Sequence, residues 1–98
     1  MRTKLFRAVS ANDNDRCVSY STYEKAYAKL QEWCDKYGYE LEQEPYDVWY
    51  HNQLLNEAKC CHNFRGWSSW GTAYAFTIVE FKTPEEYEHD LLEYSQSF

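Results

Sequence analysis

Residues 21–38 read STYEKAYAKLQEWCDKYG, and this stretch predicts an amphipathic helix around which the other elements are arranged. Ser21 followed by Glu24 has the spacing of a capping box, and Gly38 is the residue type that most readily takes the left-handed conformation beyond a helix C-terminus. Apolar and aromatic side chains recur between these ends at steps of three and four, so one side of the helix is expected to pack on a core. These side chains are Tyr23, Ala26, Tyr27, Leu30, Trp33, Cys34 and Tyr37.

The segments on either side of this helix predict strands. Residues 3–11 and 16–20 are β-prone runs separated by the turn formers NDND at 12–15, which indicates a hairpin. Residues 39–43 carry a glutamate at every second position, as in a strand with one face in water. Residues 72–81 read TAYAFTIVEF and are largely apolar on both faces, so we expect this strand at the centre of the sheet.

Three further segments complete the predicted fold. Residues 45–61 carry a helical stripe after a proline but also a strand-prone run at 47–51, and we favour the helix. Residues 63–71 contain the glycines and serines typical of a loop. Residues 83–98 open with a second capping box, in which proline takes the first helical position. This helix also has an apolar stripe, formed by Tyr87, Leu91, Tyr94 and Phe98.

These elements predict one α+β domain over residues 1–98, with a roughly four-stranded, mainly antiparallel sheet packed by two or three helices in the order β-β-α-β-(α)-β-α. A chain of this length buries enough surface for a core without disulfides. Aromatic residues make up 19% of the sequence and include ten tyrosines, more than one small core can hide. We therefore expect some aromatic side chains at the surface or in an interface.

The formal charge of −6 is concentrated in the second part of the chain. Residues 1–36 hold seven basic and five acidic residues, which gives +2, whereas residues 37–98 hold three basic and eleven acidic residues, which gives −8. A field of this sign repels a phosphate backbone, so we expect no direct binding of nucleic acid. It favours a partner with a basic surface, although acidic residues also serve simply to keep a small domain soluble.

The four cysteines predict neither a disulfide framework nor a metal site. The sequence has no signal-peptide pattern at its start and no run that is apolar enough to cross a membrane, so we expect a cytoplasmic protein with reduced thiols. Cys60, Cys61 and His62 are adjacent, but neighbouring strand residues point to opposite faces and the usual C-x₂₋₄-C spacing of zinc sites is absent. A zinc site would need distant partners, such as His51 with Cys17 or Cys34. We expect no cofactor and no metal.

Two groups of residues are candidates for binding a partner protein. The first combines aromatic side chains with an arginine, the residue types that dominate interface hot spots: Phe64, Arg65, Trp67 and Trp70. The alternative for these rings is burial in the core. The second is the acidic face of the last helix, which is expected to form a broad negative surface with the glutamates at 40, 42 and 44: Glu85, Glu88, Asp90 and Glu93. The alternative for these carboxylates is a merely solvated face.

The sequence thus predicts a non-catalytic protein-binding module, because no set of catalytic roles assembles in it. Its partner would be a larger protein with a basic surface, held by the aromatic loop and steered by the acidic half; a homo-oligomer also remains open. In general character the chain resembles the small antagonists that phages and mobile elements use against host defence nucleases, which implies inhibition by occlusion. One alternative is a nucleotide binder or sponge with a pocket of Arg65, Trp67, Trp70 and Tyr74. Another is a zinc-stabilised or thiol-dependent enzyme.

Overall fold

The structure is a computed structural model that describes residues 4–10, 16–50 and 53–96. It confirms the α+β class, although the described residues form more strands than the four expected. The elements in chain order are β1 (Phe6–Ser10), β2 (Arg16–Tyr20), α1 (Tyr23–Tyr37), β3 (Glu40–Gln43), β4 (Val48–Trp49), β5 (Ala58–Trp67), β6 (Ala73–Phe81) and α2 (Pro84–Gln96).

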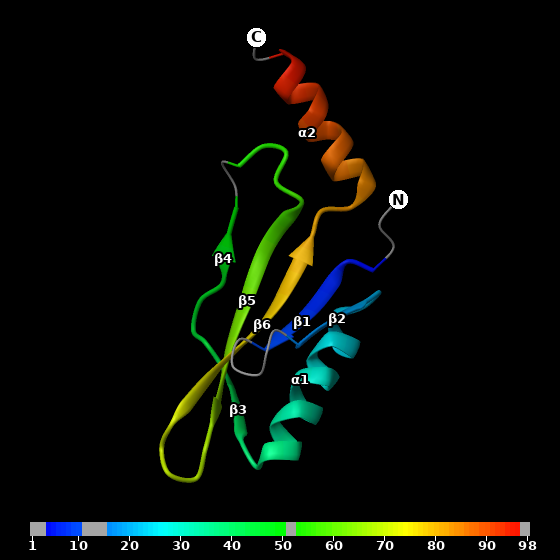
Figure 1. Ribbon diagram of the computed structural model, residues 1–98. Coiled ribbons are helices and arrows are strands. Elements are labelled where there is room, and N and C mark those ends of the chain that lie inside the picture. The colour runs from blue at the N-terminus through cyan, green and yellow to red at the C-terminus, as the bar shows by residue number, and fades with distance from the viewer. Residues whose placement is uncertain (1–3, 11–15, 51–52, 97–98) are drawn as a thin grey trace.

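All strands of the described chain join one antiparallel sheet in the order β2-β1-β6-β5-β3, with β4 also paired to β5 (Figure 1). β6 lies between β1 and β5, which confirms the central place expected from its apolar faces. The N-terminal hairpin is confirmed by the pairing of β1 with β2, while its turn at 12–15 lies outside the described residues. The long β5–β6 hairpin and α2 give an elongated molecule, 54 Å by 23 Å by 22 Å.

Helix α1 covers one face of the sheet and forms the core with it (Figure 1). Every second residue of β5 and β6 points to this face, whereas neither α1 nor α2 lies on the other face. Burying each large apolar side chain here contributes roughly 1.5–3 kcal/mol to stability. The core consists of four side chains of α1 and four of the sheet: Ala26, Leu30, Trp33, Cys34, Ala8, Phe64, Phe76 and Ile78.

The ends of α1 follow the predicted chemistry, with a shift of one residue at the start. The N-cap is Thr22 rather than Ser21, and its hydroxyl accepts a hydrogen bond from the Lys25 N–H at 3.3 Å. At the other end Gly38 has φ 71° and its N–H donates to the Asp35 carbonyl at 3.3 Å, as the glycine predicts. Either hydroxyl can cap, so the sequence alone does not fix which residue begins the helix.

The helix favoured for residues 45–61 is wrong. Val48 and Trp49 form β4, which pairs with Cys61 and Cys60, and a hydrogen bond from the Asn56 N–H to the Gln53 carbonyl closes the turn that leads into β5. Leu55 in this turn has φ 65°, a conformation that does not belong to a helix. Pairing with the long strand β5 outweighs the helical spacing of the apolar residues, which is a local preference.

The loop expected at residues 63–71 is also wrong, because β5 continues through Trp67 and leaves only a short turn before β6. Gly66, which indicated a loop, is a strand residue paired with Tyr74 on the face that α1 covers. A Cβ atom at Gly66 would lie 2.6 Å from Phe76 Cε2 and 3.2 Å from Cys34 Sγ. The glycine is therefore required by the close approach of α1 and β6, not by a bend in the chain.

This packing predicts that Gly66→Ala destabilises the protein. We expect the free energy of unfolding to fall by about 1–3 kcal/mol, because the added methyl group overpacks the core beneath α1. The cost should shrink when Phe76→Leu removes the nearest ring atoms, and a double-mutant cycle measured by denaturant unfolding checks this. If Gly66→Ala lowered the free energy of unfolding equally in the wild-type protein and in the Phe76→Leu variant, the packing explanation would be contradicted.

Candidate functional site

Helix α2 is the first element of the candidate site, and its start is built as the sequence predicts. The Glu86 N–H donates to Thr83 Oγ1 at 3.2 Å, and the Thr83 N–H donates to Glu86 Oε1 at 3.1 Å. Pro84 takes the first helical position, where its missing N–H costs nothing. The capping box therefore fixes the direction in which α2 leaves the end of β6.

Charged contacts hold the first half of α2 to the sheet. Lys59 of β5 lies 3.2 Å from Glu86 Oε2, and Lys82 forms an ion pair with Asp90 in which both side chains are partly buried. Burial acts to raise the pKa of Glu86, but hydrogen bonds from Thr83 and the charge of Lys59 outweigh it and leave this pKa lowered. The same contact with Glu86 raises the pKa of Lys59. Glu86 and Lys59 thus stabilise each other's charged forms.

The apolar stripe of α2 does not pack on the core as expected. None of the described residues of α2 is buried, and Leu91 and Leu92 are 44% and 59% exposed. The reason is the direction of the chain: β6 ends at the edge of the molecule, and α2 continues beyond the sheet instead of folding over it (Figure 1). Phe98, the last member of the predicted stripe, lies outside the described residues.

Carboxylates line the rest of the α2 surface. Helix α2 contains five acidic residues and neither lysine nor arginine. Glu86 and Asp90 are engaged with Lys59 and Lys82, whereas three carboxylates are exposed: Glu85, Glu88 and Glu93. A groove of about 370 Å³ runs along the start of the helix and is lined partly by Tyr87 and Leu91. The surface of α2 that faces away from the sheet therefore carries both exposed apolar side chains and exposed carboxylates.

The aromatic candidates are divided between the core and the tip of the β5–β6 hairpin. Phe64 is 2% exposed and lies in the core, so it is not available to a partner. Arg65 is exposed, pairs with Glu44 and lies 6.0 Å from the ring centre of Trp67. Trp67 is half-buried and Trp70 is 71% exposed in the turn. Of the two tryptophans, Trp70 is the one that offers a free ring.

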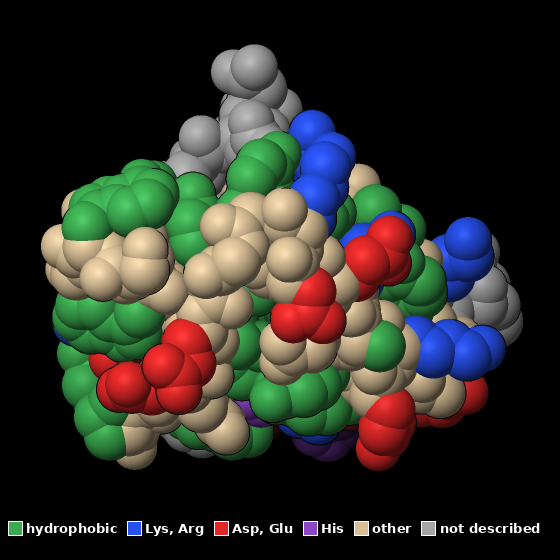
Figure 2. Space-filling view, turned by 90° about the horizontal axis from the view of Figure 1, so that it is seen from below, with side chains coloured by type: hydrophobic (Ala, Val, Ile, Leu, Met, Phe, Trp, Pro, Cys, Tyr) green, Lys and Arg blue, Asp and Glu red, His purple; other side chains and the backbone are tan. Residues whose placement is uncertain are grey.

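The two predicted groups do not form one surface. β3 pairs with residues 64–67 near the hairpin tip, whereas α2 begins beyond Phe81, which pairs with Ala58 at the other end of β5. Glu40 and Glu42 thus lie far from α2, and the broad negative surface expected from them is not formed (Figure 1). Seen from the hairpin end, hydrophobic side chains reach the surface in separate groups with carboxylates among them (Figure 2).

The pocket expected from arginine and three aromatic residues is only partly present. A groove of about 460 Å³ on the hairpin is lined by ten residues that include Arg65 and Tyr74 but neither Trp67 nor Trp70. Glu44 also lines this groove and pairs with Arg65, so the guanidinium is already neutralised. This arrangement does not favour a phosphate.

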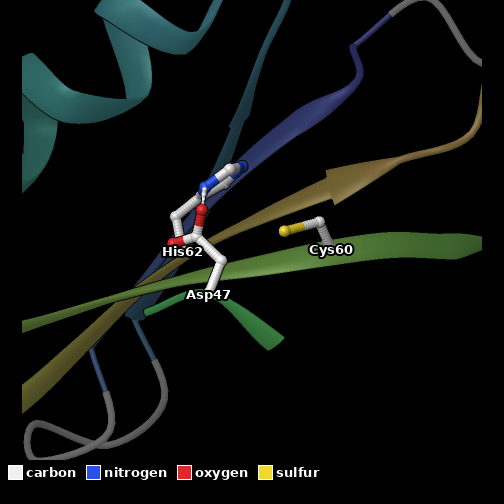
Figure 3. A group of neighbouring side chains, drawn as sticks. All are labelled: Asp47, Cys60 and His62. Atoms are coloured by element: carbon white, nitrogen blue, oxygen red, sulfur yellow. Dashed lines mark ion pairs between the residues drawn. The ribbon is translucent and has the colours of Figure 1, made fainter. Parts of the chain in front are cut away.

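A polar cluster lies on β5 beside α1 (Figure 3), and it joins Cys60 and His62, which the sequence placed side by side, to the carboxylate of Asp47. His62 Nδ1 lies 3.0 Å from Asp47 Oδ2, and His62 Nε2 lies 3.0 Å from Glu80 Oε1. Asp47, Cys60 and His62 bring their ligand atoms within 4.8 Å of one another. Asp47 was missed because it precedes β4, and only the pairing of β4 with β5 brings it opposite His62. The alternation of strand residues does place Cys60 and His62 on one face.

The two buried thiols, Cys34 and Cys60, give no sign of an activated nucleophile. Burial, with Asp35 nearby, raises the pKa of Cys34 to about 11; burial together with Asp47 and Glu80 raises the pKa of Cys60 to about 11. Both thiols are therefore protonated at neutral pH. Only the deprotonated form, the thiolate, is a good nucleophile. Cys61 faces away from Cys60 and lies 3.4 Å from the Tyr50 hydroxyl. None of the four cysteines, all of which the structure describes, forms a disulfide.

Comparison with protein-family models, with curated proteins and with solved structures gave no match. Neither helix in the described part of the chain is long and apolar enough to span a membrane. The candidate binding features of the described chain are α2, the hairpin tip and the cluster at His62.

The two threonine caps predict different effects of the same substitution. Thr83→Ala removes a cap worth about 1 kcal/mol. Because no described residue of α2 is fully buried, the loss should appear as local opening, with amide hydrogen exchange in residues 87–92 about fivefold faster and little change in Tm. Thr22→Ala is the matched control. It acts on α1, which carries half the core, so it should lower Tm by roughly 4–8 °C. Equal changes in Tm would contradict the independence of α2.

The lowered pKa of Glu86 predicts that acid loosens α2. A carboxyl group whose folded pKa is depressed stabilises the fold above its unfolded pKa, about 4.3, and loses this effect as the pH falls through the lower folded value. NMR shifts of α2 followed against pH should show the start of the helix fraying in this window. Lys59→Met removes the ion pair, so the fraying should begin at a higher pH. An unchanged titration in that variant would contradict the role of Lys59.

Proposed function

We propose that this protein is a non-catalytic protein-binding module that presents α2 to a larger protein with a basic surface. The observation that carries this proposal is that α2 is capped and held in place, yet buries none of its described residues. A helix of 13 residues with exposed leucines gains little by standing free in water. Its stability and its apolar surface are better explained by a partner that covers it.

Charge complementarity supports a basic partner. Glu85, Glu88 and Glu93 are exposed on a helix that has no lysine or arginine, within a chain of net charge −6. These carboxylates repel the α2 helix of a second copy, so they do not favour a homodimer through this helix. They accelerate the encounter with a positive surface and suppress binding to neutral or acidic ones.

The chemistry of α2 defines the expected binding groove on the partner. An amphipathic helix of this kind lies in a groove with an apolar floor, which Leu91 and Leu92 would occupy, and a basic rim, which the glutamates would contact. The helix is about 20 Å long. A groove that normally holds a nucleic-acid backbone has this rim, and α2 would then act as an inhibitor by occupying it.

Trp70 is a separate contact in this proposal. It lies at the hairpin tip, at the opposite end of the molecule from α2 (Figure 1). A partner that touches both would have to extend along the whole sheet, so we assign the main interface to α2 alone.

Charge reversal on α2 tests the proposal. The partner is captured with the full chain from its native cells, identified by mass spectrometry and purified, and its affinity is then measured directly. Glu88→Lys combined with Glu93→Lys should weaken binding at least tenfold, mainly by slowing association. The matched control, Glu40→Lys combined with Glu42→Lys, changes the net charge equally on β3, far from α2, and should alter the affinity less than threefold.

Two results would overturn the assignment. Equal losses in the two charge-reversal variants would show that only net charge matters. Loss of binding in Trp70→Ala, with full binding after charge reversal on α2, would place the interface at the hairpin tip. Replacing Leu91 and Leu92 by serine completes the test: because neither side chain is buried, the fold should remain intact while the complex dissociates faster.

A further inference from the structure

The polar cluster at His62 has two ring nitrogens and two carboxylates facing each other. His62 Nδ1 faces Asp47 at 3.0 Å and His62 Nε2 faces Glu80 at 3.0 Å. A neutral imidazole has one N–H and one lone pair, so it can donate to only one of these carboxylates. At the other nitrogen, two lone pairs would meet at hydrogen-bond distance. This arrangement needs either an additional proton, on the ring or on a carboxylate, or a bound cation.

The third member of the cluster distinguishes these two possibilities. Cys60 is fully buried, and its sulfur is directed toward Asp47 and His62 on the same side of β5 (Figure 3). An additional proton on the ring or on a carboxylate would not call for a thiol at this place. Sulfur, nitrogen and carboxylate oxygen are together the donor set that zinc prefers.

We propose that Asp47, Cys60 and His62 form a binding site for Zn²⁺. In this site His62 contributes Nδ1, Asp47 one carboxylate oxygen and Cys60 its sulfur, while the fourth position is open to water. The thiol loses its proton to the solvent when the metal binds, because thiolate is the form that coordinates. This inference is independent of the role proposed for α2.

The spacing of the ligand atoms is compatible with a tetrahedral zinc site. Ligands at the usual bond lengths of zinc lie about 3.4–3.6 Å apart, and the three ligand atoms already lie within 4.8 Å of one another. Rotation of the three side chains would close this difference when the metal binds. The backbone is fixed on both sides, since β4 is paired with β5 at Cys60 and Cys61.

The surroundings supply the outer contacts that a metal-bound histidine usually has. With Nδ1 on the metal, Nε2–H donates to Glu80, which orients the ring and makes it a better ligand. Glu80 is itself close to Lys59, at 3.7 Å. The Tyr23 ring packs edge-on against His62 at 5.3 Å and shields this side from water.

Cobalt titration of the full chain tests the site. The protein is stripped of metal with a chelator, freed of the chelator and titrated with Co²⁺, whose bond to a thiolate gives a charge-transfer band in the near ultraviolet. We expect one Co²⁺ per chain, displacement of the band by Zn²⁺ and no response to Mg²⁺, which prefers oxygen ligands. Zinc should also raise Tm in a concentration-dependent manner.

Variants of the ligands and their neighbours make the test specific. Asp47→Asn, His62→Gln and Cys60→Ser should each weaken Co²⁺ binding at least tenfold, and Glu80→Gln should weaken it about 10–100-fold through the ring. Cys61→Ser is the matched control on the other face of β5, and Cys17→Ser is the control for an exposed thiol; both should keep the band. If circular dichroism shows that Cys60→Ser unfolds, the Asp47→Asn variant becomes the decisive test of the site. Asp47 is only partly buried, so this variant should still fold.

Three results would overturn the proposal. The first is a folded protein that gives no charge-transfer band with Co²⁺. The second is a band that persists in Cys60→Ser, which would assign the thiolate to another cysteine. The third is an NMR spectrum of His62 with protons on both ring nitrogens that does not change when zinc is added, which would show that a proton holds the cluster together.

Discussion

The antiparallel pairing of β5 with β6 is the interaction on which the rest of the structure depends. It runs from Ala58 opposite Phe81 to Trp67 opposite Ala73, and it sets which side chains meet α1. Phe64 and Phe76 are paired on this face and form the floor of the core, while Gly66 leaves room for the helix. The same ladder separates the ends of the molecule, since its tip carries Trp70 and its open end leads into α2. One hairpin therefore determines the core, the cluster and the free helix.

The sequence predicted the elements whose signals are local. Gly38, the capping box at Thr83 and the alternation at 39–43 involve residues within a few positions of one another, and all three are observed. The central position of β6 was predictable because apolar residues on both of its faces need cover on both sides. These features depend on hydrogen bonds and burial that are determined largely by the residues of one short segment.

Features that depend on pairing between distant residues could not be predicted in the same way. Residues 45–61 have helical spacing, yet Val48 pairs with Cys61, thirteen residues further along the chain. The cluster at His62 depends on the same pairing, because Asp47 reaches the histidine from the residue before β4, and Glu80 reaches it from β6. The path of α2 was missed for another reason. An apolar stripe shows that a helix can be covered, but not whether this chain or another molecule covers it.

Polar contacts, rather than packing, connect α2 to the sheet. A chain of polar side chains runs from His62 through Glu80 and Lys59 to Glu86, with steps of 3.0, 3.7 and 3.2 Å. Lys59 and Glu86 are each more than a third exposed, and ion pairs of this kind are worth about 0–1 kcal/mol. Such contacts set a preferred direction for α2 without fixing it as a packed core would. A helix held in this way can adjust to the surface that covers it, which favours a role for α2 in binding over one in the stability of the domain.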